Sequence, residues 1–150
     1  MNVERILVPV DYSDHSRRAV EHAVWLGDKL GATVTVVYVA APPSTYQPLD
    51  RWIWGDRADQ HTIDDKLREA NDEAFESFVS KLPSDARSKI SSRMETGAPP
   101  SKVILDLLDE EGFDLVVMGT HGHTGAKHVL LGSTTERVIR RAKCPVLTVR

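Results

Sequence analysis

One stretch of the sequence gathers glycines in a way that suits phosphate binding. Of the chain's nine glycines, four lie between positions 118 and 138, namely Gly119, Gly122, Gly125 and Gly132. Glycine adopts positive φ and lets the backbone approach another group closely. The stretch leads into Ser133-Thr134-Thr135-Glu136, which fits the S-x-x-E capping box of a helix start. Because free N–H groups and the positive end of the helix dipole attract phosphate there, we predict a phosphate-binding loop.

The spacing of these glycines differs from the two common phosphate-binding motifs. The P-loop pattern G-x-x-x-x-G-K-[ST] is absent, because Lys127 does not follow a glycine and Gly132-Ser133 lacks the lysine. The dinucleotide-binding pattern G-x-G-x-x-G is absent as well. The chain carries Gly119-x2-Gly122-x9-Gly132-Ser133 instead.

Three histidines in the same stretch raise the alternative of a metal site. His121, His123 and His128 lie within eight residues, and histidine is a common zinc ligand. No cysteine or carboxylate lies beside them, so we expect that they hold no metal. Phosphoryl transfer needs a positioned base and charge clamps on the phosphate, and beyond Lys127 and these histidines nothing marks a nucleophile–base pair. We therefore expect a site without catalytic residues.

Alternating strand and helix patterns define the elements around this stretch. Short runs of apolar, β-branched or alternating character predict strands at 5–10, 33–39, 89–97, 113–119 and 145–149. Helical periodicity between them predicts a helix that ends at Gly31, one at 63–82, one that opens at Pro99 and Pro100, and one at 133–141. The candidate caps of the first helix are Asp11, Ser13 and Asp14. The helix at 63–82 is expected to bury Leu67, Ala70, Ala74, Phe75 and Phe78.

This alternation predicts the α/β fold class, with an open five-stranded parallel sheet and helices on both faces. With the first strand central, the strand order is 3-2-1-4-5. Ligands of such sheets bind beyond the carboxyl ends of the strands, at the point where the order reverses. The strand ends at that point are "VPVD" (8–11) and "VVMG" (116–119), and the glycine stretch begins there.

Composition excludes several other classes of function. With 150 residues, of which 41% are hydrophobic, the chain suits one globular domain over 1–150. Its formal charge of −3 provides no basic field for nucleic acid, and no apolar run approaches the roughly 18 residues of a membrane span. The first ten residues, which already read as a strand, lack the pattern of a signal peptide. The single cysteine, Cys144, fits a reducing compartment. We therefore expect a cytoplasmic protein.

The chain resembles the ATP-binding branch of the universal stress protein family, whose motif is G-x2-G-x9-G-[ST]. The resemblance covers essentially the whole chain, through "RILVPVDYSDHS", "GAPPSKVI", "FDLVVMGTHGHTG" and "LLGSTTERVIRRAKCPVLTV". It implies a Rossmann-like fold and ATP as the ligand, with or without Mg²⁺. It also implies a nucleotide-dependent regulator or stress-response factor. The alternatives are a slow ATPase or autokinase, or a receptor for another adenine nucleotide such as cyclic AMP.

By this resemblance, an adenosine site carries over onto the ends of the predicted strands. Asp11, which follows Pro9 and Val10, is suited to ribose hydroxyls, although it is also a candidate helix cap. Val39 would offer backbone groups to the adenine edge, and Met118 would pack against the base or sugar. The residues around the phosphates would be Gly119, His121, Gly122, Gly132, Ser133, Thr134 and Thr135. Tyr12 stands where many relatives have a smaller residue or phenylalanine.

The last predicted strand bears on assembly. In the order 3-2-1-4-5 it lies at an edge, where apolar side chains and unpaired backbone groups favour association. The family resemblance also implies dimerisation through this strand. We predict a two-fold homodimer in which Val146–Val149 pair antiparallel with the same residues of a second chain. In the alternative, a loop such as the one with Trp52 and Trp54 covers this edge in a monomer.

Overall fold

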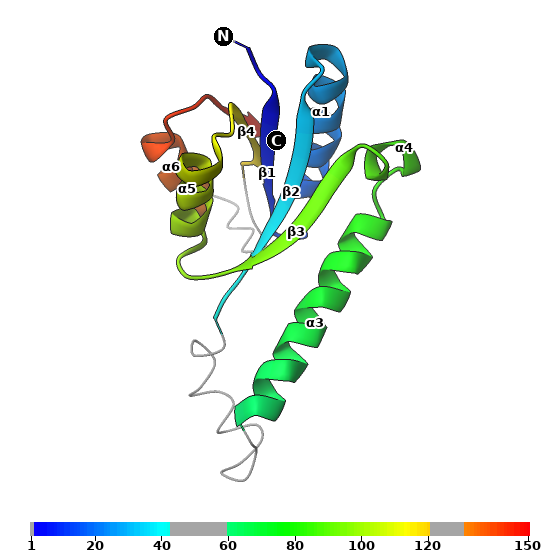
Figure 1. Cartoon of the computed structure of the whole chain (residues 1–150), viewed down its shortest axis with the longest axis vertical. Coiled ribbons are helices and arrows are strands. Elements are labelled where there is room, and N and C mark those ends of the chain that lie inside the picture. The colour runs from blue at the N-terminus through cyan, green and yellow to red at the C-terminus, as the bar shows by residue number, and fades with distance from the viewer. Residues whose placement is uncertain (1, 43–59, 121–130) are drawn as a thin grey trace.

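The computed structural model describes residues 2–42, 60–120 and 131–150, with side chains in all of these except 60–64. A parallel sheet lies at its centre (Figure 1) and consists of β1 Arg5–Val10, β2 Thr33–Ala40, β3 Ile90–Thr96, β4 Leu115–Gly119 and β5 Val146–Val149. The strand order is β3-β2-β1-β4-β5, and every neighbouring pair is parallel. The predicted fold class and strand order are both confirmed.

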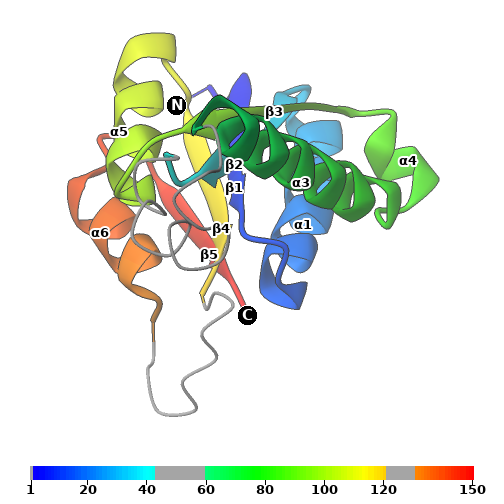
Figure 2. The same ribbon diagram turned by 90° about the horizontal axis from the view of Figure 1, so that it is seen from below.

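Helices cover both faces of this sheet (Figure 2). On one face lie α1 Asp14–Leu30, α3 Gln60–Ser80 and α4 Ser84–Arg87, and on the other lie α5 Pro100–Glu111 and α6 Ser133–Arg141. Successive residues of a strand point to opposite faces. Ile6 and Val8 therefore join the core on the α1 side, whereas Leu7 joins the core on the α5 side. All three are fully buried, which explains why β1 reads as a continuous apolar run.

Capping residues define both ends of α1. Of the three candidate caps, Ser13 is the N-cap, and its hydroxyl accepts a hydrogen bond from the Ser16 N–H at 3.2 Å. At the other end Gly31 adopts a φ of 69°, a left-handed conformation that suits glycine. The predicted end of this helix is confirmed, and α1 begins directly after the turn that follows β1.

Helix α3 buries a narrower side than the one predicted. Phe75 and Phe78 are buried as expected and Leu67 is half-buried, but Ala70 and Ala74 are exposed. The two phenylalanine rings and Leu82 beyond the helix set the centre of the buried side, and at 100° per residue Ala74 lies at the margin of that side and Ala70 well beyond it. Alanine offers too little apolar surface to outweigh the rings. The amino-terminal half of α3 runs past the carboxyl ends of the strands in Figure 1.

The one-turn helix α4 was not predicted from the sequence. It occupies Ser84–Arg87 after Pro83 and buries only Ala86. Four residues are too few to show a helical period. In the sequence, α4 connects α3 to β3. Its presence does not alter the predicted order of the strands and helices that form the site.

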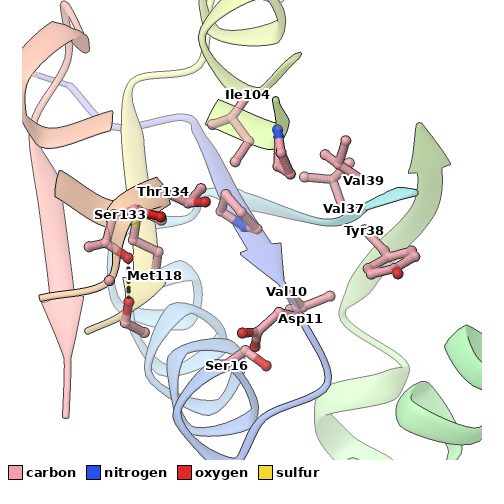
Figure 3. Close-up of a pocket in the computed structure, with 15 residues that line it drawn as sticks. Val10, Asp11, Ser16, Val37, Tyr38, Val39, Ile104, Met118, Ser133 and Thr134 are labelled. Carbon is pink, nitrogen blue, oxygen red and sulfur yellow. Dashed lines mark hydrogen bonds between the residues drawn. The ribbon is translucent and has the colours of Figure 1, made fainter. Parts of the chain in front are cut away.

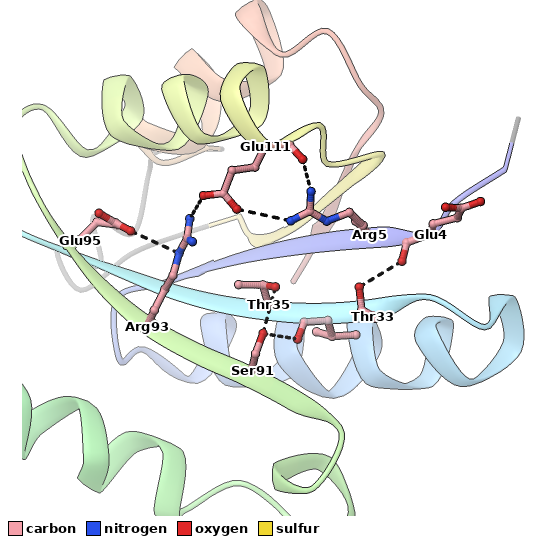
Figure 4. Close-up of polar contacts among 9 residues, drawn as sticks. Glu4, Arg5, Thr33, Thr35, Ser91, Arg93, Glu95 and Glu111 are labelled. Atoms are coloured by element: carbon pink, nitrogen blue, oxygen red, sulfur yellow. Dashed lines mark hydrogen bonds and ion pairs between the residues drawn. The ribbon is translucent and has the colours of Figure 1, made fainter.

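A network of charged side chains joins the carboxyl end of α5 to the sheet (Figure 4). Glu111 accepts from Arg93 of β3 at 2.5 Å and pairs with Arg5 of β1 at 3.4 Å. Arg5 also donates to the backbone carbonyl of Glu111. The Arg93 guanidinium holds the pKa of the Glu111 carboxyl below its ordinary value. These contacts hold α5 across the sheet.

Candidate functional site

A cavity of about 300 Å³ opens at the carboxyl edge of the sheet, where the strand order reverses (Figure 3). Its walls come from the ends of β1, β2 and β4 and from the first turns of α1, α5 and α6. The lining residues are Pro9, Val10, Asp11, Ser16, Val37, Tyr38, Val39, Pro100, Ile104, Met118, Gly119, Gly132, Ser133, Thr134 and Thr135. Its volume is at the lower end of the roughly 300–1,000 Å³ of small-molecule sites.

Every predicted site residue within the described ranges lines this cavity. These residues are Pro9, Val10, Asp11, Val39, Met118, Gly119, Gly132, Ser133, Thr134 and Thr135. The predicted residues His121 and Gly122 lie outside the described residues, as do Gly125, His123, His128, Trp52 and Trp54. The structure thus brings together side chains from four segments that are far apart in the sequence.

Five lining residues were missed by the sequence reasoning. Val37 and Tyr38 precede Val39 on β2, and their position at the carboxyl edge was a usable signal. Pro100 and Ile104 share one side of α5, because residues four apart on a helix are neighbours. The Pro99-Pro100 pair predicted only the start of this helix. Ser16 is a buried polar residue of α1, and no local pattern marks its position.

The turn between β1 and α1 orients the carboxylate of Asp11. Its Oδ1 accepts hydrogen bonds from the Ser13 N–H at 3.1 Å and from the Ser13 hydroxyl at 2.6 Å. The Ser16 hydroxyl in turn donates to the Ser13 carbonyl at 2.9 Å. Asp11 therefore does not cap α1 itself but anchors the residue that does. Its carboxylate oxygens are acceptors suited to hydroxyl or amino groups of a ligand.

The start of α6 differs from the predicted capping box. Ser133 is the first residue of the helix, the N-cap is Gly132 with φ −67° and ψ 147°, and no side chain caps it. The first intrahelical bond runs from the Glu136 N–H to the Gly132 carbonyl at 2.9 Å. In a capping box the serine occupies the N-cap position. Here Gly132 occupies that position and Ser133 follows it, so the Ser133 hydroxyl does not cap the helix. Ser133 is exposed at the cavity wall.

Three hydrogen bonds fix the start of α6 against the end of the sheet. The buried Thr135 hydroxyl donates to the Gly119 carbonyl at 2.9 Å. The Gly132 N–H donates to the Thr120 carbonyl at 2.8 Å, and the Thr120 N–H donates to the Val149 carbonyl at 2.9 Å. The first N–H groups of α6, which have no acceptor within the helix, are thereby held at the cavity as a ready anion-binding group.

Gly119 is needed for close packing rather than for an unusual backbone angle. A Cβ at this position would lie 2.9 Å from the Cβ of His15 and 3.0 Å from its carbonyl carbon. Real Cβ atoms essentially never show a contact of 2.9 Å, so any larger residue would push α1 away from β4. The absence of a side chain lets the first turn of α1 pack closely against the end of β4, beside the cavity.

The charges around the cavity are unevenly distributed. Asp11 supplies the only carboxylate among the described lining residues, and no lysine or arginine is among them. Asp11 lies away from Ser133 and Thr134 in Figure 3.

Within the described ranges, no group of His, Cys, Asp and Glu side chains is arranged to hold a metal ion. Nor does a helix in those ranges have both the length and the apolar character to cross a membrane.

The fold and the cavity define an open α/β protein with a cavity at the switch point of its sheet. Residues 2–150 match the Universal stress protein family, and the chain belongs to this family. It is 34% identical over 149 residues to the universal stress protein MJ0531 of Methanocaldococcus jannaschii, an alignment that covers 98% of this chain and 82% of that relative.

Two solved structures are similar over nearly their whole length. The structure of MJ0577, a protein of the same archaeon, has a TM-score of 0.76 and 26% identity, with 99% of this chain and 96% of that chain covered. A universal stress protein in complex with cAMP has a TM-score of 0.60 and 29% identity, with 100% and 98% covered.

Proposed function

We propose that this chain binds ATP in the cavity and acts as a nucleotide-dependent regulator rather than an enzyme, in the cytoplasm. The observation that carries the proposal is the position of the α6 start. Its first turn is hydrogen-bonded to the end of β4 and faces a cavity whose opposite side carries the Asp11 carboxylate. The motif Gly119-x2-Gly122-x9-Gly132-Ser133 supports assignment to the ATP-binding branch of the family.

The uneven charge orients the nucleotide. Phosphates are attracted to the N–H groups and dipole of α6 and repelled by Asp11. The ribose hydroxyls or an amino group of the nucleotide can instead donate to the Asp11 carboxylate. The apolar part of the lining, which includes Val37, Ile104 and Met118, provides a surface for the adenine ring. Backbone groups of Val39 then lie where the adenine edge can be recognised.

Two alternative functions use the same cavity. Cyclic AMP is favoured as a competitor by the similar universal stress protein that was solved in complex with cAMP. A slow ATPase or autokinase needs cationic clamps on the phosphate, and the described lining residues include no lysine or arginine. A cyclic AMP receptor differs from an ATP-binding regulator in its ligand preference. A slow ATPase or autokinase differs from it in releasing phosphate or labelling the protein.

The proposal is tested by titrating nucleotides into protein from which bound nucleotide has been removed. Isothermal titration calorimetry with ATP, ADP and cyclic AMP should show one site per chain with a preference for ATP. A parallel assay of phosphate release and of protein labelling by γ-labelled ATP should stay at background. A preference for cyclic AMP would transfer the proposal to that ligand, and phosphate release that disappears in a site variant would make the protein an enzyme.

We also propose that two chains associate through β5. This strand lies at one edge of the sheet and pairs only with β4 among the described strands. Leu147 on β5 is 39% exposed and Ile139 on the neighbouring α6 is 43% exposed. Unpaired backbone groups next to exposed apolar side chains favour the antiparallel pairing of two edges.

A further inference from the structure

Four aromatic rings lie together beside the cavity. The Tyr12 ring stacks on the Tyr38 ring, with centroids 4.4 Å apart and planes at 24°. Phe78 of α3 lies 5.5 Å from Tyr12, and Phe75 lies 6.3 Å from Tyr12 and 6.4 Å from Tyr38. Tyr38 is a lining residue whose ring points away from Val37 and Val39 in Figure 3. This aromatic cluster therefore lies on the α3 side of the sheet, at the edge of the proposed nucleotide site.

The Tyr12–Tyr38 stack extends the contact between β1 and β2 beyond their backbone ladder. The last residue pair of that ladder is Val10 with Tyr38. Asp11 comes next in the chain, and Tyr12 then contacts Tyr38 again through its ring. Asp11 is thus held from both sides, by the ladder before it and by the stacked ring after it.

The backbone of Tyr12 adopts a conformation that its own side chain disfavours. Tyr12 has a φ of 68°, and it is the only residue other than glycine with positive φ in the described part of the chain. A bulky side chain disfavours this conformation, so surrounding packing must maintain it. The turn brings the N–H and hydroxyl of Ser13 onto Asp11. Packing of the Tyr12 ring against Tyr38 and α3 therefore supports the orientation of Asp11.

The hydroxyl of Tyr12 does not contribute to this support. Its oxygen is buried and has no hydrogen-bond partner among the described residues. Burial also raises the pKa of the phenol, which stays protonated. The ring alone makes the contacts, so phenylalanine at this position keeps them.

We propose that Tyr12 is a positioning residue for the nucleotide site, whose ring holds the Asp11 carboxylate in the orientation that meets the ligand. This inference rests on the proposed function. It assigns a role in ligand binding to a side chain that does not line the cavity.

The test is a double-mutant cycle on ATP affinity in nucleotide-free protein. The variants are Tyr12→Gly, Asp11→Ala, their combination, and Tyr12→Phe as the matched control. Glycine tolerates positive φ, so Tyr12→Gly removes the ring without forbidding the turn. We expect Tyr12→Gly and Asp11→Ala each to weaken ATP binding by about tenfold, as loss of a hydrogen bond to a charged group does. The combined variant should bind no more weakly than Asp11→Ala alone, and Tyr12→Phe should match the wild type.

Multiplying losses in the combined variant would show that the ring acts independently of Asp11 and would overturn the inference. Unchanged affinity in Tyr12→Gly or in Asp11→Ala would overturn it as well. If Tyr12→Gly does not fold, Phe78→Leu replaces it in the cycle with the same expectation, because it removes a ring that packs against Tyr12 and does not line the cavity. A wild-type chain that binds no ATP would instead overturn the proposed function, and the inference with it.

Discussion

Replacing Ser133 by aspartate separates two effects of a charge at the start of α6. Ser133 is the first residue of the helix, is exposed, and caps nothing with its side chain. In the unliganded protein, an added carboxylate interacts favourably with the helix dipole, so the free energy of unfolding should rise by about 0.3–1 kcal/mol. In the complex, the same carboxylate repels the phosphates. Stability and affinity should therefore change in opposite directions.

The loss of affinity follows from the distance between the charges. At about 6 Å and an effective dielectric constant of about 40, between the values for a protein surface and for water, two unit charges repel by about 1.4 kcal/mol. That corresponds to about a tenfold weaker Kd for ATP by calorimetry. Ser133→Asn, whose side chain has nearly the shape of aspartate without its charge, should bind ATP about tenfold more tightly than Ser133→Asp. Equal ATP affinity in the two variants would refute the location of the phosphates at α6.

Four further expectations follow. ATP at about 100 times its Kd should raise the free energy of unfolding by about 2.7 kcal/mol, and a melting temperature unmoved by millimolar ATP contradicts this. Gly122→Val should abolish ATP binding while the circular dichroism spectrum stays native, because a β-branched residue disfavours positive φ and occupies the place of the phosphate; retained affinity would count against it. Because Arg93 lowers the pKa of Glu111, their pair stabilises the fold above about pH 4.3 and is lost as the pH falls through the lowered pKa. Glu111→Gln should thus reduce the free energy of unfolding by up to about 1 kcal/mol at pH 7 and by nothing in acid, and a difference independent of pH excludes this account. Sedimentation equilibrium should give the mass of two chains, and of one chain for Leu147→Pro; a single-chain wild type rules out the dimer, and a dimer unaffected by Leu147→Pro moves the interface elsewhere.

The sheet could be predicted because its signals are local and redundant. Residues 6–10 are apolar without interruption, which is typical of a strand buried on both faces. Gly31 and Gly112 adopt positive φ at the ends of α1 and α5, which is the usual role of glycine there. The buried side of α3 was predicted correctly at Phe75 and Phe78, but its width was not, because alanine fits the buried and the exposed side of a helix equally well.

The location of the candidate site was also predictable, but its internal contacts were not. The glycine stretch and the strand order together predicted a site at the switch point, which is where the cavity lies. The S-x-x-E pattern predicted Ser133 as the N-cap, whereas the N-cap is Gly132, whose backbone is extended. The sequence pattern alone does not show at which of the two residues the helix begins. The positive φ of Tyr12 had no local signal either. It depends on rings from β2 and α3, which only the tertiary structure brings together.

A crystal structure of the chain grown with ATP tests the location and the orientation of the nucleotide together. We expect electron density for the nucleotide in the cavity at the carboxyl edge of the sheet. Its phosphates should lie at the first turn of α6, beside Ser133 and Thr134, and its ribose should lie near Asp11, with the base against Val39. A nucleotide bound elsewhere, or one whose phosphates lie next to Asp11, would contradict the proposed site.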